Sequence, residues 1–381
     1  MTAPLRLGYI PLVDAAPLIA AVEFGFAEEE GLPLELSRAT SWSMLRDLLD
    51  FGQVDAAHML SVMVVARALA LGGSGPPLEA LMVLSLNGQV FGLSPRLPAL
   101  PFDDPVAAGR VLSGVGRVLR IGVPFVFSMH AELLTYWLER AAPDVRVEIR
   151  SVPPPRMAEA MMADEIDGFC VGEPWGSQAV ELAGAQLALS GSAIWSQAPE
   201  KVLAARQGWA EHDPATATKL MRALWRAARW TADPANHLLL AEVMSRPGYL
   251  DVSSDLVDRT LSQRVLVAPQ GPELHIPQFQ TFHEGAANFP WRSQAAWIGS
   301  RLAVRLGLDE DDAMTRARAV FRSDLYRRHV GPVGAALPRA SEKAEGAYSS
   351  EDAHPAVQGS LILSRNRFFD AHVFDPQDVL G

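Results

Sequence analysis

The order of predicted elements repeats along the chain, and this repetition constrains the fold more than any single motif. Residues 5–60 and residues 119–171 each read as strand, helix, strand, loop, helix and strand. The segments 44–60 and 157–171 correspond, and each has an acidic residue, Asp55 or Asp167, just before a small, apolar strand. Strands joined through helices form parallel sheets with right-handed crossovers. We therefore predict two similar α/β lobes with a ligand cleft between them.

The bulk properties agree with a soluble, two-lobed protein. A chain of 381 residues is too long for one ordinary core, and its 49% apolar and 20% charged residues are typical of globular proteins. The net charge of −11 disfavours a nucleic-acid-binding surface. An anionic ligand would therefore need positive potential from the site itself. No run of about 18 apolar residues predicts a membrane span.

The N-terminal residues bear on cellular location. Residues 1–10 lead almost at once into a strand-like alternation, without the basic start, apolar core and small-residue cleavage site of a secretory signal. No lipoprotein cysteine precedes this strand, and the single cysteine, Cys170, allows no intrachain disulfide. We expect a cytoplasmic protein.

Helix and strand signals extend this outline over the whole chain. Strands are expected over 5–10, 34–36, 54–60, 78–86, 119–123, 145–149 and 168–171. Helices are expected over 18–30, 42–49, 130–138, 156–162, 214–230, 236–244, 280–289, 297–306 and 310–321, with Asp14, Ser41 and Ser61 as N-caps. Residues 331–359, rich in Gly, Pro, Ala, Ser and Glu, predict a linker or mobile loop. The aromatic tail at 368–374 is expected to dock on a lobe.

The segment from Asp167 to Trp175 predicts one wall of the cleft. Its short buried strand is stopped by Gly172 and Pro174, which leaves Glu173 and Trp175 at the carboxyl end of the strand. Ligands bind at that end of the strands in open α/β sheets. A carboxylate there is costly unless it is paired, and Lys201 or Arg156 could complement Glu173.

Polar and aromatic residues at predicted strand-to-helix junctions are the candidate ligand-binding residues: Trp42, Gln89, His130, Glu173, Trp175 and Lys201. Trp42 would lie at a helix N-terminus, which favours anions through its free N–H groups, and its indole is a donor. Gln89 follows an Asn-Gly turn signal and offers an amide donor. The alternatives are a core tryptophan, an exposed turn glutamine, a capping or surface histidine and a solvated lysine.

Catalytic chemistry has weaker signals. Cys170 with a histidine could form a thiol nucleophile, but a mid-strand cysteine is more commonly buried and inert. The sequence has no metal-ligand spacing, no phosphate-binding glycine loop and no Gly-x-Ser-x-Gly motif. We therefore predict a two-lobe binding module for a small polar or anionic ligand, with no catalytic residue, metal or cofactor.

Several segments resemble one known family, the nitrate- and bicarbonate-binding proteins of ABC importers. They are Leu7–Ile10, Asp14–Leu18, Ser41-Trp42, Asp55–His58, Asn87–Gln89, His130 before Tyr136–Leu138, Val152–Pro154, Phe169–Trp175, Pro199–Lys201 and the Phe369-Asp370 tail. The resemblance implies an α/β, two-lobe type II periplasmic-binding-protein-like fold. It divides the chain into lobe I, residues 1–95 and 205–381, and lobe II, residues 96–204.

The resemblance also implies a ligand and a site. In that family a tryptophan, a glutamine, a histidine and a lysine hold the anion, and they fall on Trp42, Gln89, His130 and Lys201. Pro154, Gly172 and Glu173 would line the same cleft, with Glu173 orienting Lys201 or a backbone donor. Nitrate is planar and accepts hydrogen bonds only, so N–H donors and one positive charge match it.

Without an export signal the chain is most similar to the cytoplasmic branch of the family, the NasS-type nitrate and nitrite sensors. The implied function is to hold an RNA-binding antiterminator of the NasT type and release it when the anion binds, which regulates nitrate assimilation without direct nucleic-acid contact. The alternatives are the solute-binding component of an ABC importer for nitrate or bicarbonate, and an enzyme on the same fold that uses Cys170 or His130.

Overall fold

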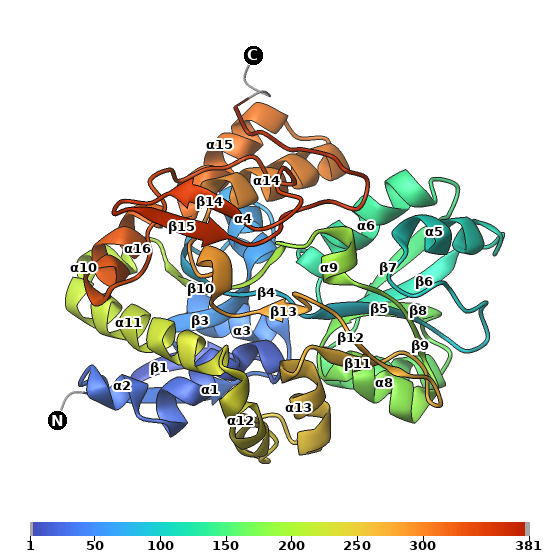
Figure 1. Cartoon of the computed structure of the whole chain (residues 1–381), viewed down its shortest axis with the longest axis horizontal. Coiled ribbons are helices and arrows are strands. Elements are labelled where there is room, and N and C mark those ends of the chain that lie inside the picture. Colours follow the sequence, from blue (N-terminus) through green and yellow to red (C-terminus); the bar gives the residue numbers. More distant parts are fainter. Residues whose placement is uncertain (1–2, 378–381) are drawn as a thin grey trace.

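Two mixed β-sheets form the centres of the two lobes and lie side by side in Figure 1. The computed structural model describes residues 3–377. The six-stranded sheet has the order β13 (Gln280–Thr281), β4 (Leu78–Asn87), β10 (Pro199–Arg206), β3 (Ala56–Leu60), β1 (Leu5–Tyr9) and β2 (Leu34–Arg38). The five-stranded sheet has the order β7 (Val147–Ser151), β6 (Leu119–Val123), β8 (Gly168–Gly172), β5 (Gln89–Leu93) and β9 (Gln186–Ser190).

The predicted repetition is confirmed by strand pairing. In the six-stranded sheet β1 pairs in parallel with β2 and β3, and in the five-stranded sheet β6 pairs in parallel with β7 and β8. In each sheet an antiparallel strand lies next to the parallel trio: β10 beside β3 in the first sheet, and β5 beside β8 in the second. The sequence does not predict β10, because Leu203, Ala204 and Ala205 favour helix. Pairing with β3 and β4 on its two sides overrides that preference.

The chain crosses between the sheets at two places. It leaves the six-stranded sheet at Asn87 and Gly88, whose φ angles of 55° and 90° turn β4 into β5, and it returns between β9 and β10. Strand pairing therefore places β5 in the second sheet and all of β10 in the first. The lobe boundaries at 95/96 and 204/205 stay a prediction from the sequence.

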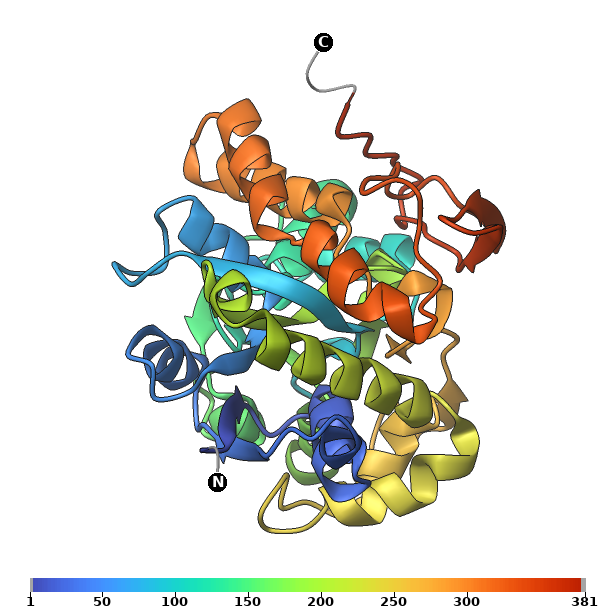
Figure 2. The ribbon, with the colours of Figure 1, turned by 90° about the vertical axis from the view of Figure 1, so that its left-hand side faces the viewer.

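Helices cover both sheets. In Figure 2, α11 lies across the first lobe between α1 and α16, both of which it contacts. The helices of the first lobe are α1 (Ala16–Glu23), α2 (Phe26–Glu29), α3 (Trp42–Asp50), α4 (Ser61–Ala68), α10 (Trp209–His212), α11 (Pro214–Thr231), α12 (His237–Met244), α13 (Ser254–Leu261), α14 (Arg292–Leu306), α15 (Glu310–Val320) and α16 (Ser323–Val330). Those of the second are α5 (Pro105–Ser113), α6 (Met129–Ala141), α7 (Met157–Met162), α8 (Trp175–Ala183) and α9 (Gly191–Ile194). No helix in residues 3–377 is long and apolar enough to cross a membrane.

Helix boundaries test the predicted caps. Ser41 caps α3 by accepting a hydrogen bond from the Met44 N–H, as predicted. Asp14 and Ser61 are not caps: Asp14 lies in the 3₁₀-helix η1 (Val13–Ala15), and the Ser61 hydroxyl donates to the Pro199 carbonyl at 2.6 Å. Gly25, with a φ of 80°, divides the helix predicted over 18–30 into α1 and α2.

The C-terminal third departs most from the prediction. Residues 280–289 form β13 and the 3₁₀-helix η4 (Glu284–Ala286) instead of an α-helix, and β11 (Arg264–Leu266) and β12 (Glu273–His275) form an unpredicted hairpin. The segment 331–359 begins with the 3₁₀-helix η5 (Gly331–Val333), and its later residues form β14 (Asp352–Pro355), paired with β15 (Ser360–Leu363). Two further 3₁₀-helices, η2 (Pro154–Arg156) and η3 (Pro234–Asn236), precede α7 and α12.

The aromatic tail docks as predicted. The Phe368 ring stacks on Trp195, with ring centroids 4.8 Å apart, and on Trp297 at 5.7 Å. Asp370 accepts a hydrogen bond from the Tyr136 hydroxyl at 3.1 Å and pairs with Arg140 at 2.7 Å, both on α6. The tail therefore connects α14 with α6 and α9 of the second lobe (Figure 1).

Candidate functional site

A fully buried cluster of charged side chains lies between the two sheets. Its centre is Lys201 on β10, whose Nζ lies 2.8 Å from Asp14 Oδ2 and 2.7 Å from Glu200 Oε1. Lys201 is 0% exposed, Glu200 1% and Asp14 3%. Charges are excluded from such environments unless they are paired. Asp14 comes from η1, so the cluster joins two segments that are far apart in the sequence.

A local irregularity of β10 explains why two adjacent residues face the same cluster. Side chains normally alternate between the faces of a strand. The register of β10 against β4 shifts on both sides of Lys201, which is the signature of a β-bulge. The bulge allows the Glu200 and Lys201 side chains to meet instead of pointing to opposite faces.

The charges of the cluster follow from these contacts. Burial opposes ionisation of Asp14, but the nearby Lys201 and His58 outweigh it and hold the pKa of Asp14 at about 2. Burial would likewise lower the pKa of Lys201, but Asp14 and Glu200 raise it overall. Burial raises the pKa of Glu200 to about 7, with Lys201 acting in the opposite direction. The cluster therefore contains one permanent ion pair and a carboxyl group that titrates near neutrality.

Two buried histidines flank the ion pair. His58 Nε2, from β3, lies 3.0 Å from Asp14 Oδ1. His130 Nδ1, from the first turn of α6, lies 3.2 Å from Glu200 Oε1. Burial and the Lys201 charge hold the pKa of His130 well below its usual range. His130 is therefore neutral, and its imidazole can donate one hydrogen bond without adding charge.

Trp42, Gln89 and Gly172 complete the cluster. Lys201 Nζ lies 5.3 Å from the centroid of the Trp42 ring, which follows the Ser41 cap at the N-terminus of α3. Gln89 is the register partner of Gly172 across β5 and β8. A Cβ atom added to Gly172 would lie 3.7 Å from His130 Nε2 and 4.0 Å from Asp14 Oδ2. Glycine thus keeps this position open beside both groups.

Several polar atoms of the cluster lack partners. The indole Nε1 of Trp42, the amide nitrogen and oxygen of Gln89 and both ring nitrogens of His130 are buried and make no hydrogen bond within residues 3–377. Buried polar groups are almost always satisfied, and leaving one unpaired costs about 1–3 kcal/mol. Asp14 Oδ1, Glu200 Oε2 and both ring nitrogens of His58 are unpaired as well. The donors in this set, from Trp42, Gln89 and His130, come from three elements around one lysine and are available to a hydrogen-bond acceptor.

The segment that ends β8 closes directly on the first lobe. The Val13 N–H donates to the Glu173 carbonyl at 2.9 Å, and the Trp175 indole donates to the Pro11 carbonyl at 2.7 Å. Both bonds join the second lobe to the loop that carries Asp14. The cluster is therefore enclosed by contacts between the lobes.

The structure brings together five of the seven predicted site residues: Trp42, Gln89, His130, Gly172 and Lys201. Pro154 is buried at the start of η2, and no hydrogen bond or ion pair among residues 3–377 links it to the cluster. The assignment of all seven to ligand binding stays a prediction.

Glu173 contacts neither of the two cations proposed for it but does have a backbone donor as its partner. Its Oε2 accepts from the Ser177 N–H in the first turn of α8 at 3.0 Å, which agrees with a backbone donor as its partner. Arg156 is exposed and pairs with Glu159 at 3.0 Å, whereas Lys201 pairs with Asp14 and Glu200. Glu173 therefore stabilises a helix N-terminus. Burial raises its pKa to about 7.

Sequence reasoning missed Asp14, His58 and Glu200 as members of the cluster. Their signal was available in the sequence: His58 is a polar residue within an apolar strand, and Glu200-Lys201 is a charged pair before an apolar run. Asp14 was interpreted as a helix cap because aspartate before Ala-Pro is a common start signal.

Comparisons with known proteins agree with this architecture. The crystal structure of the periplasmic nitrate-binding protein NrtA from Synechocystis PCC 6803 matches with a TM-score of 0.82 and 24% identity, covering 98% of this chain and 96% of that chain. A ligand-binding component of an ABC-type import system from Staphylococcus aureus matches with a TM-score of 0.67 and 16% identity, covering 86% of this chain and 99% of that chain. The predicted two-lobe periplasmic-binding-protein fold is confirmed.

Sequence relatives extend the comparison. The nitrate import ATP-binding protein NrtC of Synechocystis is 32% identical over 386 residues, which are 99% of this chain and 54% of NrtC. The nitrate/nitrite binding protein NrtA of Nostoc is 28% identical over 390 residues, 99% of this chain and 84% of NrtA. This chain thus spans about half the length of the first NrtC relatives. The model of the NMT1-like family matches residues 1–245, and the chain belongs to that family.

Proposed function

We propose that this protein binds nitrate or nitrite in the Lys201 cluster. These anions are small, singly charged and accept hydrogen bonds only, which suits the Trp42 indole, the Gln89 amide and a neutral His130 as donors. The names of the relatives, nitrate/nitrite binding protein NrtA and nitrate import protein NrtC, support this ligand class.

The observation that carries the proposal is the set of buried, unpartnered donors around Lys201. A structural ion pair would need only Asp14, Glu200 and Lys201, and the two carboxyl groups already contact the Lys201 ammonium. Donors of Trp42, Gln89 and His130 add nothing to that pair and are unpaired within the described residues. An acceptor-only anion would satisfy them together.

Titration calorimetry with nitrate, nitrite and bicarbonate tests whether the protein binds these anions. The Gln89→Leu variant tests whether they bind in the Lys201 cluster. A hydrogen bond to a charged group contributes about 1.5–3 kcal/mol, so we expect Gln89→Leu to weaken nitrate binding roughly 10- to 100-fold. Stability should not fall, because leucine removes an unpaired buried amide at this position.

Gln53→Leu is the matched control, since Gln53 is exposed and is not one of the cluster residues. It should leave nitrate affinity unchanged. If the wild-type protein binds none of the three anions, the proposed function is wrong; if Gln89→Leu binds nitrate as well as Gln53→Leu does, the site is misplaced.

A protein with such a site could serve either as a component of an importer or as a sensor. The names of the relatives support an importer component, whereas the sequence resemblance to NasS-type sensors supports a cytoplasmic regulator of an NasT-type antiterminator. We propose the sensor role. The lobes meet through the Val13–Glu173 and Trp175–Pro11 hydrogen bonds. An anion that binds more tightly when these contacts are formed would favour this arrangement over a more open one, and a partner that binds the open arrangement would then be released.

Size-exclusion chromatography with an NasT-type antiterminator distinguishes the two settings. For a sensor we expect a complex without anion and its dissociation on addition of nitrate. Chloride at the same ionic strength controls for screening and should not dissociate it. A complex that persists in nitrate, or no complex at all, would favour the importer component.

An enzyme that uses Cys170 is the remaining alternative. Cys170 lies on β8, is 4% exposed, and burial raises the pKa of its thiol. Thiolate, not thiol, is the reactive form, so this cysteine is poorly suited to nucleophilic attack. We expect Cys170→Ala to keep full nitrate affinity by calorimetry, and the native wild-type thiol to resist an alkylating reagent. Rapid modification, or lost affinity in a folded Cys170→Ala protein, would support the enzyme.

A further inference from the structure

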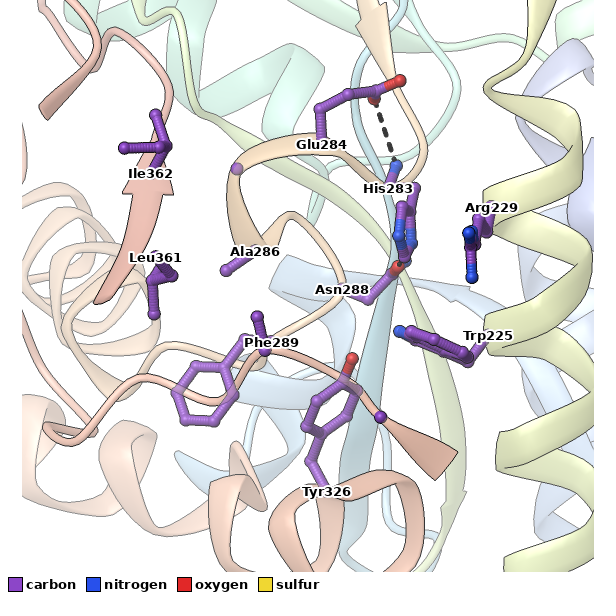
Figure 3. A pocket seen from close by; sticks show the side chains of 13 residues that line it. Trp225, Arg229, His283, Glu284, Ala286, Asn288, Phe289, Tyr326, Leu361 and Ile362 are labelled. Atoms are coloured by element: carbon purple, nitrogen blue, oxygen red, sulfur yellow. Dashed lines mark hydrogen bonds between the residues drawn. The ribbon is translucent and has the colours of Figure 1, made fainter. Parts of the chain in front are cut away.

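We propose a second ligand site, for a small monocarboxylate with an apolar body, in a cavity of the first lobe. The cavity has a volume of 320 Å³ and lies between α11, α16, the η4 region and β15 (Figure 3). None of its lining residues belongs to the Lys201 cluster. Its volume is at the lower end for small-molecule sites, which limits the ligand to about the size of benzoate or a short branched acid.

Two donor groups point into this cavity. The Trp225 side chain is 8% exposed and that of Tyr326 is 3% exposed. The Trp225 Nε1 and the Tyr326 hydroxyl both face the cavity in Figure 3. Neither atom is among the buried unpartnered atoms of residues 3–377, so both open onto the cavity and are available to donate to a polar ligand in it.

Arg229 supplies positive charge beside these donors. It follows Trp225 by one turn on α11, so both residues share a helix face. Its side chain is exposed and lies next to Trp225 and His283 in Figure 3. Arg229 is the single cation among the residues that line the cavity. A guanidinium group matches a carboxylate with two parallel hydrogen bonds.

The other polar residues define the charge of the ligand. His283 is held by Asn288, with Nδ1 and Oδ1 3.1 Å apart, and burial lowers its pKa, so it is neutral. The Glu284 carboxylate accepts from the His283 backbone N–H at 3.4 Å and is turned away from the cavity centre (Figure 3). Arg229 is then the single cation facing the ligand, which favours one negative charge.

An apolar wall lies opposite Arg229. It consists of Ala286, Phe289 and Leu361, the last from β15 (Figure 3). A ligand with an aromatic or branched aliphatic body would cover this wall while its carboxylate bound Arg229, Trp225 and Tyr326.

Calorimetric titration of the whole protein with benzoate and 3-methylbutanoate tests the proposal, with benzamide as the uncharged analogue. We expect saturable binding of at least one acid and binding of benzamide at least tenfold weaker. Arg229→Gln and Tyr326→Phe should each weaken acid binding about tenfold, since each removes one hydrogen-bonding group from the carboxylate.

Matched controls separate this site from the anion cluster. Arg226, also on α11, pairs with Glu30 at 2.9 Å and does not line the cavity, so Arg226→Gln should bind the acid normally. Arg229→Gln should keep full nitrate affinity, and Gln89→Leu full affinity for the acid. The proposal is overturned if neither acid saturates the protein by about 10 mM. It is also overturned if benzamide equals benzoate, or if Arg229→Gln behaves like Arg226→Gln.

Discussion

Replacement of Lys201 by methionine is expected to abolish measurable nitrate binding and to lower the free energy of unfolding by about 3–5 kcal/mol. Methionine keeps most of the side-chain volume but removes the single cation of the cluster. Asp14 would remain buried and ionised beside an apolar side chain, 2.8 Å from the former position of Nζ. Loss of one partner of a buried ion pair is costly because the other charge stays desolvated.

Urea unfolding and nitrate calorimetry measure the two effects separately. Lys219→Met is the matched control, since Lys219 is only half-buried and contacts the Gly31 carbonyl at 3.1 Å, and it should change neither quantity appreciably. Adding Asp14→Asn to Lys201→Met should restore part of the lost stability without restoring nitrate binding. Nitrate affinity within twofold of wild type in the Lys201→Met protein would remove Lys201 from the site.

Nitrate affinity is expected to fall as the pH rises through about 7. Asp14 already offsets the charge of Lys201, so the cluster is neutral when Glu200 is protonated and carries −1 when Glu200 is ionised. The groups that face Glu200 are Lys201, His130, the Cys170 thiol and, beyond Lys201, Asp14. A bound anion adds negative charge beside Glu200 and raises its pKa further, so binding above pH 7 takes up one proton.

The direction of the change in nitrate affinity with pH follows from this uptake of a proton. Below the free-state pKa of Glu200, about 7, affinity is constant because Glu200 is protonated with or without the anion. Above it, affinity falls by up to about tenfold per pH unit until the pKa of the complex is reached. Nitrate itself does not titrate in this range, which makes it the right probe. Calorimetry from pH 6 to pH 9 measures the slope.

Two glutamine variants assign that slope to one carboxyl group. Glu200→Gln should bind nitrate with an affinity that no longer depends on pH near neutrality. Glu173→Gln should keep the wild-type slope, although burial raises the pKa of Glu173 to the same value of about 7, because that side chain faces Ser177 and not the cluster. A flat wild-type profile, or an equal slope in Glu200→Gln, would show that Glu200 does not titrate against the anion.

Local signals in the sequence determined the framework of this protein. The repeated strand and helix order predicted the parallel trios β1–β2–β3 and β6–β7–β8, because those strands are short, apolar and separated by helical segments. Ser41 predicted the start of α3, and the helical spacing of apolar residues predicted a helix over 214–230, where α11 begins at Pro214. These features depend on residues within a few positions of one another, and so a single sequence contains them.

The tertiary structure alone decided what surrounds Lys201. Lys201 contacts Asp14 because β10 pairs with β3 in the interior of a sheet. The sequence did not predict β10, because several of its residues favour a helix. The bulge that turns Glu200 to the same side is a property of strand pairing and has no local signature. Glu173 was predicted near the cluster, yet its side chain caps α8, since a backbone N–H four residues later was the nearer partner. Asp14 and Lys201, separated by nearly half of the chain, become neighbours only when β10 has joined the six-stranded sheet that also contains β1, because burial and long-range pairing arise from the fold as a whole.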